Sequence, residues 1–448
     1  MAMKMTSKKR VAFHTLGCKV NQYDTHAMME QFIDSGYEIV DFDEYAHIYI
    51  VNTCTVTNLS DRKSRQMLRK AHRRNPEAIV AAVGCYAQNA ADVLFAIPGV
   101  KLVLGNSDRH KIVDYIEKIE KIGVPINAVS NIMEERLFEE TPISSYSERT
   151  RAVIKIQEGC NQFCTYCIIP YARGPIRSRE PEYIIDEVKR IVEAGFKEIV
   201  LTGIHITSYG KDIKDIDLID LIKSIHNIDG LERIRLGSLE PTYIDKRFID
   251  NFISLPKLCP HFHISLQSGS DSTLKRMGRR YTTNEYGKIV EALKRANQDV
   301  AITTDVMVGF PGETDREFKE TYKFVRDMEF SKIHVFKYSP REGTPAAKFK
   351  HQVPSEVKQE RSDELITLSD KLERQFINRF LGKGKKVLFE QLSSKHRDMY
   401  EGYTANYIKV MAKSGINIQN ELLPVKLERI DNGALFGKIK GNDRKEGF

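Results

Sequence analysis

Three cysteines lie close together in this 448-residue chain, in the pattern Cys160-x-x-x-Cys164-x-x-Cys167. Soft thiolates bind iron–sulfur clusters, and three of them on one short loop can hold three irons of a cubane. The fourth iron then stays open to an outside ligand. The alternative is a structural zinc knot, but such knots take four ligands, and no neighbouring His or Cys completes the set. The spacing therefore favours a cluster.

A second set of three cysteines follows the first strands of the chain. Apolar strands are expected at 11–15, 47–52 and 78–83, with helical patterns at 23–35 and 61–74 between them. Cys18, Cys54 and Cys85 each come one to three residues after one of these strands. Because the carboxyl ends of parallel strands open on one edge of a sheet, these thiols are expected to meet and could bind a second cluster. The alternative is three unrelated buried thiols.

Composition indicates a protein of a reducing compartment. No apolar run approaches the length that spans a bilayer, and the polar, basic segment Met1 to Arg10 predicts no signal peptide. The seven cysteines show no disulfide pattern, which points to metal binding or catalysis. We therefore expect a cytoplasmic protein without a membrane partner. Cys259, outside both triads, is expected to be a packing thiol.

The middle of the chain predicts a partial barrel. Strand candidates recur, mostly separated by helical patterns, at 152–157, 198–202, 233–237, 261–266, 301–308 and 333–338. Six such βα units place functional loops at the carboxyl ends of the strands, and the first of these loops carries Cys160, Cys164 and Cys167. A charged helical pattern at 354–380 is expected to lead away from the barrel.

The last residues predict a small β-barrel. Short strands are expected at 386–390, 407–411, 422–427 and 435–439. Barrels of this size often bind RNA, and the alternative is a cap that only stabilises the protein.

Basic residues are concentrated in two places on a chain of net charge +8. The segment Arg62 to Arg74 carries seven positive charges and no acid, and residues 383–448 contain 13 Lys and Arg against 8 Asp and Glu. Such a density can neutralise phosphates, although a solvated helical face would look the same. Nucleic acid is therefore the leading candidate for an anionic partner.

The expected fold class is α/β, with more than one domain because the chain is too long for a single ordinary core. We expect an N-terminal parallel α/β cluster domain at 9–134 and a polar linker at 135–150. A central partial (β/α)6 barrel follows at 151–380, and a small C-terminal all-β barrel at 381–445.

The two cysteine triads, in this order, resemble the radical S-adenosylmethionine (SAM) methylthiotransferase family, from about residue 10 to residue 440. Within that family, the segments Thr15 to Asp24 and Cys160 to Gly174 are similar to the branch that modifies N6-threonylcarbamoyladenosine at tRNA position 37. The resemblance implies a radical SAM barrel and a C-terminal barrel of the RNA-binding TRAM type. It also implies two [4Fe–4S] clusters and SAM as cofactors, with tRNA, an electron donor and a sulfur source as partners.

The resemblance also implies a role for each triad. Cys160, Cys164 and Cys167 would bind the radical-generating cluster, and Cys18, Cys54 and Cys85 the auxiliary cluster that supplies or relays sulfur. One SAM would methylate sulfur at the auxiliary cluster. A second SAM would be cleaved to a radical that activates carbon 2 of the adenine ring for methylthio insertion.

Five further residues match SAM-facing positions of the family less specifically, and a turn or cap role is the alternative for each. Tyr166 corresponds to an aromatic residue near adenine. Gly203, in Thr202-Gly203-Ile204-His205, lies in the loop that meets the SAM amino group, although the acidic form common in the superfamily is absent. Glu240 and Gln267 stand at strand ends where ribose or carboxylate could bind, and Asp305 would help to shape the adenosine pocket.

Three alternative functions remain. A methylthiotransferase for a ribosomal-protein aspartate would carry a proline beside the first cysteine, whereas Lys19 follows Cys18 here. A methylthiotransferase for isopentenyladenosine in tRNA belongs to the same family. A non-enzymatic iron–sulfur RNA-binding or electron-transfer protein would need four thiolates per cluster, and neither triad has a fourth.

Overall fold

In the computed structural model, which describes residues 8–141, 143, 150–431 and 433–440, the chain begins with a sheet of six parallel strands. In sheet order the strands are β2 (Glu38–Val40), β1 (Arg10–Thr15), β3 (Ile48–Thr53), β4 (Ile79–Gly84), β5 (Val100–Leu104) and β6 (Ile126–Asn127). The helices are α1 (Lys19–Asp34), α2 (Asn58–Arg74), α3 (Cys85–Asn89), α4 (Ala91–Phe95) and α5 (Ile112–Ile122).

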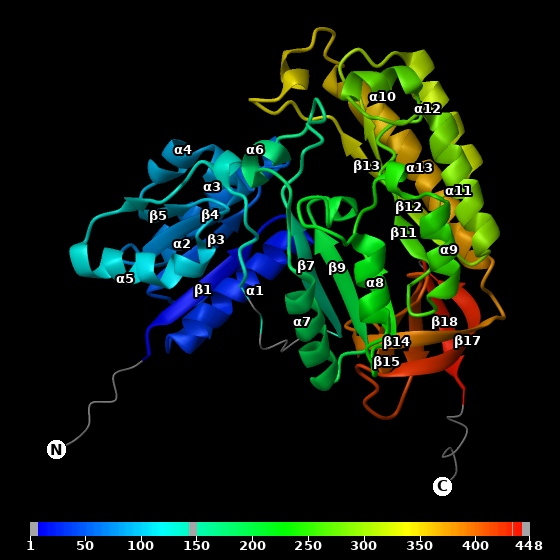
Figure 1. Cartoon of the computed structure of the whole chain (residues 1–448), viewed down its shortest axis with the longest axis horizontal. Helices are drawn as coiled ribbons and strands as arrows, with labels where there is room; N and C mark the ends of the chain where they lie inside the picture. The colour runs from blue at the N-terminus through cyan, green and yellow to red at the C-terminus, as the bar shows by residue number, and fades with distance from the viewer. Residues whose placement is uncertain (1–7, 142, 144–149, 432, 441–448) are drawn as a thin grey trace.

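Helices cover both faces of this sheet (Figure 1). α1 and α5 pack on one face, while α2, α3 and α4 pack on the other. Every residue of the central strands β3 and β4 is buried, as expected for parallel strands covered on both sides. All the strands therefore end at one edge, which faces the middle of the molecule.

A partial barrel of six parallel strands follows. Its strands are β7 (Arg151–Glu158), β9 (Glu198–Gly203), β10 (Arg233–Leu236), β11 (His261–His263), β12 (Ala301–Val308) and β13 (Lys332–Lys337), and a short β8 (Arg177–Ser178) pairs antiparallel with β7. A parallel bridge between Leu239 and Ile264 joins the two halves of the barrel. The helices are α6 (Ile169–Arg173), α7 (Pro181–Glu193), α8 (Leu218–His226), α9 (Lys246–Ser254), α10 (Asp271–Met277), α11 (Thr283–Ala296), α12 (Asp315–Met328) and α13 (Ser355–Asn378).

Alternation along the barrel strands separates core from lumen. On β7, Ala152, Ile154 and Ile156 belong to the apolar core beneath the surrounding helices. Arg151 and Lys155 alternate with them, so they point to the opposite side of the strand. Several helices have side-chain caps; for example, Thr282 and Glu285 form a capping box at the start of α11.

The chain ends in a closed five-stranded barrel in the order β14-β15-β16-β18-β17. Its strands are β14 (Gly384–Leu392), β15 (Met399–Thr404), β16 (Lys409–Lys413), β17 (Leu422–Asp431) and β18 (Ala434–Ile439). This small barrel docks against the amino ends of the strands of the partial barrel. Arg233 Nη2 donates to Lys386 O at 2.8 Å, and Arg235 Nη1 donates to Ala405 O at 3.0 Å.

The predicted fold class is confirmed: a parallel α/β domain, a partial barrel and a small all-β barrel follow one another. The domain boundaries stay predictions, and residues 142, 144–149 and 441–445 of the expected linker and tail lie outside the described residues. None of the described helices is long and apolar enough to cross a membrane.

Several details differ from expectation, and the strands β2, β5, β6 and β8 were not predicted. The helix α13 does not lead away from the barrel, because Leu365, Leu368 and Leu372 are buried in the barrel's core and the helix packs on β13. The strand β15 was not predicted. Its sequence alternates only weakly and contains Gly402, where a side chain would clash with Leu388 O at 2.4 Å.

Candidate iron–sulfur site

The barrel triad lies on the loop after β7. Gly159, just before Cys160, has a φ of +72°, and a Cβ there would lie 1.8 Å from Pro175 O. Only glycine lets the two backbone segments come this close. The loop therefore packs against the segment after α6, where the Cys160 N–H donates to Gly174 O at 3.0 Å. Cys167 N–H donates to Cys164 O at 2.9 Å, which closes the loop into a turn.

Two hydrogen-bond donors reach these thiols. Arg279 Nη1 donates to Cys164 Sγ at 3.3 Å, and the backbone N–H of Gln162 donates to Cys160 Sγ at 3.5 Å. Burial raises the pKa of Cys160 to about 11 and that of Cys167 to about 12, and the nearby Cys164 thiol raises both further. Ligands of this kind lose their protons when metal binds.

Arg279 is itself held by a carboxylate. Its Nη2 lies 2.6 and 2.8 Å from the two oxygens of Glu240, and His205 Nε2 lies 3.8 Å from the same carboxylate. Arg279 and Glu240 are both mostly buried, so this pair fixes the guanidinium that points at Cys164.

The N-terminal triad converges at the strand edge of the sheet. Cys18 is the N-cap residue of α1, Cys54 follows β3, and Cys85 opens α3 directly after β4. Cys85 raises the pKa of both Cys18 and Cys54, after the larger effect of burial. Gly17 adopts a φ of +103°, and a Cβ there would lie 3.1 Å from Cys54 Sγ. The missing side chain therefore leaves room beside the thiols.

An arginine of the barrel reaches into this second triad. Arg173, the last residue of α6, is fully buried, and its Nε donates to Cys85 Sγ at 3.1 Å. Its Nη2 also donates to Asn21 Oδ1. Because Gly174, the next residue, accepts the hydrogen bond from Cys160, one short segment contacts both triads.

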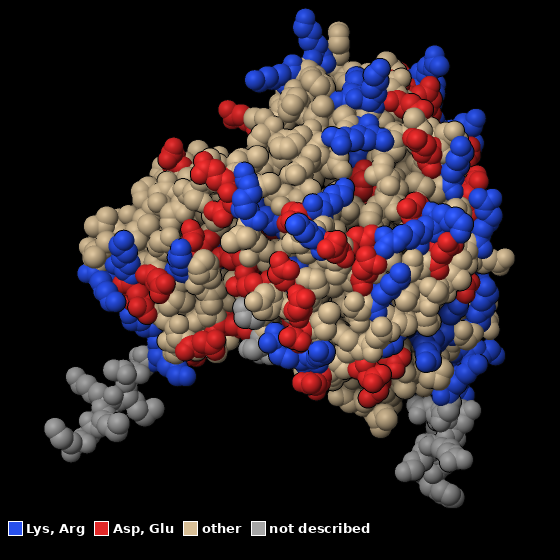
Figure 2. Space-filling view, in the orientation of Figure 1, with Lys and Arg blue, Asp and Glu red and all other residues tan. Residues whose placement is uncertain are grey.

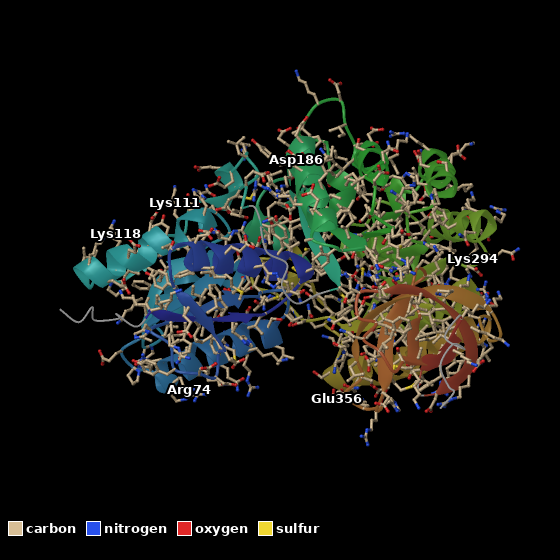
Figure 3. All side chains as sticks on the ribbon, turned by 90° about the horizontal axis from the view of Figure 1, so that it is seen from below. Arg74, Lys111, Lys118, Asp186, Lys294 and Glu356 are labelled. Atoms are coloured by element: carbon tan, nitrogen blue, oxygen red, sulfur yellow. The ribbon has the colours of Figure 1, made fainter. Side chains whose placement is uncertain are left out.

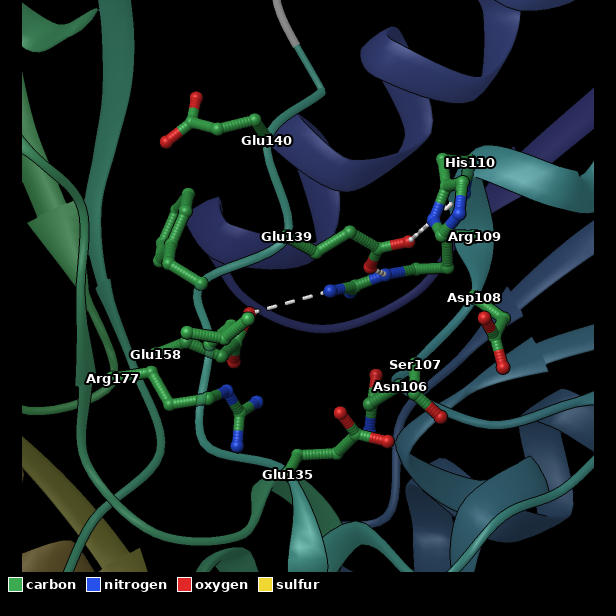
Figure 4. Close-up of a pocket in the computed structure, with 12 residues that line it drawn as sticks. Asn106, Ser107, Asp108, Arg109, His110, Glu135, Glu139, Glu140, Glu158 and Arg177 are labelled. Carbon is green, nitrogen blue, oxygen red and sulfur yellow. Dashed lines mark hydrogen bonds and ion pairs between the residues drawn. The ribbon is translucent and has the colours of Figure 1, made fainter.

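Buried ion pairs extend from Arg173 across the domain interface. Its Nη1 lies 2.8 Å from Glu158 Oε1 on β7 and 3.0 Å from Asp24 Oδ2 on α1. Arg109 and Lys155 bind the same two carboxylates. Figure 4 shows Arg109 and Glu158 paired at the wall of a cavity of about 320 Å³ between the two domains. The cations lower the pKa of Asp24 and Glu158, although burial acts in the opposite direction.

Each triad offers three thiols, the donors that iron–sulfur clusters take. Within the described ranges, no three or more His, Cys, Asp or Glu side chains are grouped tightly enough to hold one metal ion. Each triad also has a thiol that accepts a hydrogen bond from a buried arginine, which stabilises a thiolate.

Four of the five predicted SAM contacts lie at or after the carboxyl ends of barrel strands, and Asp305 lies within β12. Tyr166 is partly buried against Phe310, with ring centroids 6.3 Å apart. Gly203 ends β9, two residues before His205, whose N–H donates to Gln157 Oε1 at 2.7 Å.

Gln267 and Asp305 are neighbours. Gln267 has a φ of +67°, and its N–H donates to Asp305 O at 2.8 Å. The Asp305 carboxylate lies 3.2 Å from His263 Nε2. Both oxygens of Glu240 bind Arg279, and its predicted contact with SAM stays a prediction. Cys259 is buried outside both triads.

Sequence reasoning assigned no role to Arg173 and did not select Arg279. Arg173 lies in the segment that follows the barrel triad, but the reach of its side chain to Cys85 has no signal in spacing or periodicity. Arg279 follows the αL residue Gly278 at the end of α10, which is a common helix end.

Comparisons with known proteins agree with this geometry. The model of the Radical SAM superfamily matches residues 154–325, and that of the Uncharacterized protein family UPF0004 matches residues 10–105. The solved structure of the radical S-adenosylmethionine methyltransferase TsrM from Kitasatospora setae shares the fold, with a TM-score of 0.59 over 76% of this chain and 77% of that chain. Its sequence identity is 14%.

Curated relatives are similar over almost the whole chain. Threonylcarbamoyladenosine tRNA methylthiotransferase MtaB of Bacillus subtilis is 46% identical over 93% of each chain. MtaB of Aquifex aeolicus is 42% identical over 85% of this chain and 92% of its own. The tRNA-2-methylthio-N(6)-dimethylallyladenosine synthase of Clostridium novyi is 34% identical over 96% of each chain. The chain therefore belongs to the radical SAM methylthiotransferase family.

Proposed function

We propose that this protein adds a methylthio group to carbon 2 of N6-threonylcarbamoyladenosine at tRNA position 37. The observation that carries the proposal is the pair of converging thiol triads, joined by Arg173, in a chain 46% identical to MtaB. A methylthio transfer needs both a radical at carbon 2 and a sulfur held beside it, and one triad can serve each need.

The two cysteine triads have different roles. Cys160, Cys164 and Cys167 hold the radical-generating cluster, and the N-terminal cysteines hold the auxiliary cluster. When bound, the two [4Fe–4S] clusters and SAM supply the methyl group, the sulfur relay and the radical. The protein's own contribution is to fix both triads on one rigid interface, which the buried ion pairs around Asp24 and Glu158 hold together.

The SAM pocket is proposed at the carboxyl ends of the barrel strands. Tyr166 and Asp305 flank the adenosine part, while Gly203 and Gln267 line the methionyl side. Glu240 acts through Arg279, which it orients toward Cys164.

Two basic regions are proposed to bind tRNA. On α2, Lys70 and Arg74 pair with Asp43, while Arg62, Lys63, Arg69 and Arg73 are exposed. The C-terminal barrel is the second region. It also covers the amino ends of the strands of the partial barrel, and one barrel can both cap these strands and bind RNA. On the face in Figure 2, basic side chains are interspersed with acidic ones, so a few local groups rather than one broad patch would contact phosphates.

Three further partners belong to the proposal. Insertion of sulfur at carbon 2 consumes electrons and sulfur, so an electron donor and a sulfur source must supply them. We place the protein in the cytoplasm, where its tRNA substrate is found.

The direct test is transfer in vitro. The protein with both clusters, SAM, dithionite and a sulfide source is mixed with anticodon stem–loop RNA that carries threonylcarbamoyladenosine, isopentenyladenosine or adenosine. We expect methylthiolation of the first RNA. Cys85→Ala is expected to keep SAM cleavage and lose transfer, while Cys259→Ala is the control outside both triads. Preferential reaction of the isopentenyladenosine RNA would contradict the proposal.

A further inference from the structure

Two aromatic side chains are exposed beside the barrel triad. Phe163 lies in the triad loop directly before Cys164, and Tyr171 lies on α6, the helix that ends with Arg173. The two rings meet edge to face, with their centroids 5.7 Å apart. Even so, 42% of Phe163 and 41% of Tyr171 remain exposed. Together they offer apolar surface to the solvent, next to a loop whose cysteines are themselves buried or half-buried.

The backbone of Phe163 indicates that an aromatic ring has a use at this position. Its φ is +49°, in the left-handed region, which is strained for a bulky side chain. Glycine or asparagine would adopt this conformation with less strain. Full burial of the ring does not offset the strain, because much of the ring is exposed. Strained residues of this kind are concentrated at functional sites.

A cavity of about 320 Å³ opens beside the same loop. Asn161 and Gln162, the two residues before Phe163, form one part of its wall. Lys211 and Arg280 form another part, and both side chains are exposed. Among the described residues, neither of these two cations pairs with a carboxylate. The cavity and the two rings therefore share one loop.

The wall of this cavity carries an excess of positive charge. Asp212 also lines it, but both of its carboxylate oxygens already accept hydrogen bonds. One accepts from the Ser178 N–H at 2.7 Å, and the other accepts from Ser178 Oγ at 2.5 Å. Two cations without carboxylate partners thus face one carboxylate that has partners. A phosphate group suits this arrangement, because an ammonium and a guanidinium both bind phosphate oxygens.

Exposed rings beside a positively charged cavity are the combination with which proteins bind single-stranded nucleic acid. The rings stack on the faces of unpaired bases, and the cations contact the phosphates between them. The position of this surface also suits the tRNA. The nucleotides on either side of position 37 are joined to the reacting base, so they must pass close to the triad loop when carbon 2 is brought to this triad.

We propose that Phe163 and Tyr171 stack an unpaired base next to position 37, while Lys211 and Arg280 bind a phosphate of the same strand. The inference rests on the proposed function, and it adds a third contact for tRNA to α2 and the C-terminal barrel. Stacking and phosphate binding do not depend on the substituent at N6. Stem–loops with adenosine or threonylcarbamoyladenosine at position 37 should therefore both bind here.

Stacking is tested with stem–loop RNAs that carry the fluorescent base 2-aminopurine on one or the other side of position 37. We expect the cluster-loaded protein to quench the fluorescence of one of them. Phe163→Leu is expected to reduce the quenching and to weaken binding roughly tenfold, with an unchanged salt dependence. Phe163→Tyr keeps a ring and should behave like the unmodified protein. Tyr183→Leu is the control, since Tyr183 is 56% exposed but lies on α7.

The phosphate contact is tested by the salt dependence of RNA binding. Lys211→Gln combined with Arg280→Gln should reduce the slope of log K against log salt by about 0.7, the value for one phosphate of a single strand. The quenching at saturation should stay unchanged. The control is Lys118→Gln combined with Lys121→Gln, which removes the same charge from α5. Lys118 lies at the end of the N-terminal domain far from the barrel (Figure 3), so the control should keep the slope of the unmodified protein.

Two results would overturn the inference. If Phe163→Leu leaves both the quenching and the affinity unchanged, no base stacks on this ring. If RNA binding is unchanged but reduced flavodoxin reduces the barrel cluster of Phe163→Leu more slowly than dithionite does, relative to the unmodified protein, the surface binds an electron carrier instead. Methylthiolation by the unmodified protein is measured separately. Its absence would refute the proposed function, whatever the stacking measurement shows.

Discussion

Arg173 Nε lies 3.1 Å from Cys85 Sγ, so an arginine of the barrel donates a hydrogen bond to a thiol of the N-terminal domain. The same guanidinium binds Asp24 and Glu158. A cationic donor at a cluster sulfur favours the reduced, more negative state and so raises the reduction potential. Arg173 is therefore expected to set the potential of the auxiliary cluster.

This expectation is tested with Arg173→Lys in a protein whose barrel triad has been changed to alanine. The redox titration then measures the auxiliary cluster alone. Lysine keeps the charge but cannot contact Cys85 and both carboxylates at once. We expect a more negative midpoint potential in a redox titration. The control is Arg179→Lys, a buried arginine that binds Glu140 and Glu187. Equal potentials for Arg173→Lys and its parent would contradict this role.

Removal of the Glu240 carboxylate should slow radical formation. Glu240→Gln leaves Arg279 with a weaker partner, so the guanidinium beside Cys164 is held less firmly. We expect 5′-deoxyadenosine formation without RNA to fall roughly tenfold, the scale of one charge-assisted hydrogen bond. Glu317→Gln is the control, because Glu317 also binds an arginine through both oxygens, Arg276. A similar loss in both variants would assign Glu240 a purely structural role.

A methyl group at Gly17 should displace the auxiliary cluster alone. The Cβ of Gly17→Ala would lie 3.0 Å from Cys54 Cβ and 3.1 Å from its sulfur, on a backbone with a φ of +103°. We expect about half of the iron to be lost, since two clusters of equal size are present in the parent protein. SAM cleavage should remain. Gly36→Ala also has a positive φ but meets no atom within 4 Å, so it should keep all its iron.

The buried ion pairs predict acid sensitivity of the domain interface. Burial raises the pKa of Asp24, but Arg109, Lys155 and Arg173 outweigh it, so the pKa of the folded protein lies below that of the unfolded chain. A lowered carboxyl pKa contributes stability above the unfolded value, near 4, and this stability is lost as the pH falls through the folded value.

Asp24→Asn should therefore destabilise the apoprotein by about 3–5 kcal/mol at neutral pH, because it leaves buried cations without a partner. The difference should shrink as the pH falls below about 4, where the unfolded parent chain takes up a proton, and it should level off once Asp24 of the folded parent is protonated as well. Urea unfolding across this range measures it. Asp186→Asn, which alters an exposed pair with Lys189, should have little effect. A difference that stays constant with pH would contradict the account.

The sequence predicted the parts of the structure that follow from periodicity. Alternating strands and helices place Cys18, Cys54 and Cys85 at the ends of parallel strands, and the sheet does bring them to one edge. The same rule places the barrel triad after β7. Both predictions depend only on backbone geometry, which the apolar pattern determines.

Contacts made by long side chains could not be predicted in this way. Arg173 and Arg279 each reach a thiol distant in sequence, and Glu240 binds Arg279. The first contact depends on how two domains pack against each other, and the others on how loops of the barrel meet.

The central claim concerns the nucleoside that this protein modifies. The most direct test is mass-spectrometric nucleoside analysis of tRNA from cells that lack the protein. We expect 2-methylthio-N6-threonylcarbamoyladenosine to be missing and N6-threonylcarbamoyladenosine to accumulate, with both restored by the unmodified gene and not by one that encodes Cys85→Ala. Unchanged levels of the methylthiolated nucleoside in the deletion strain would contradict the account.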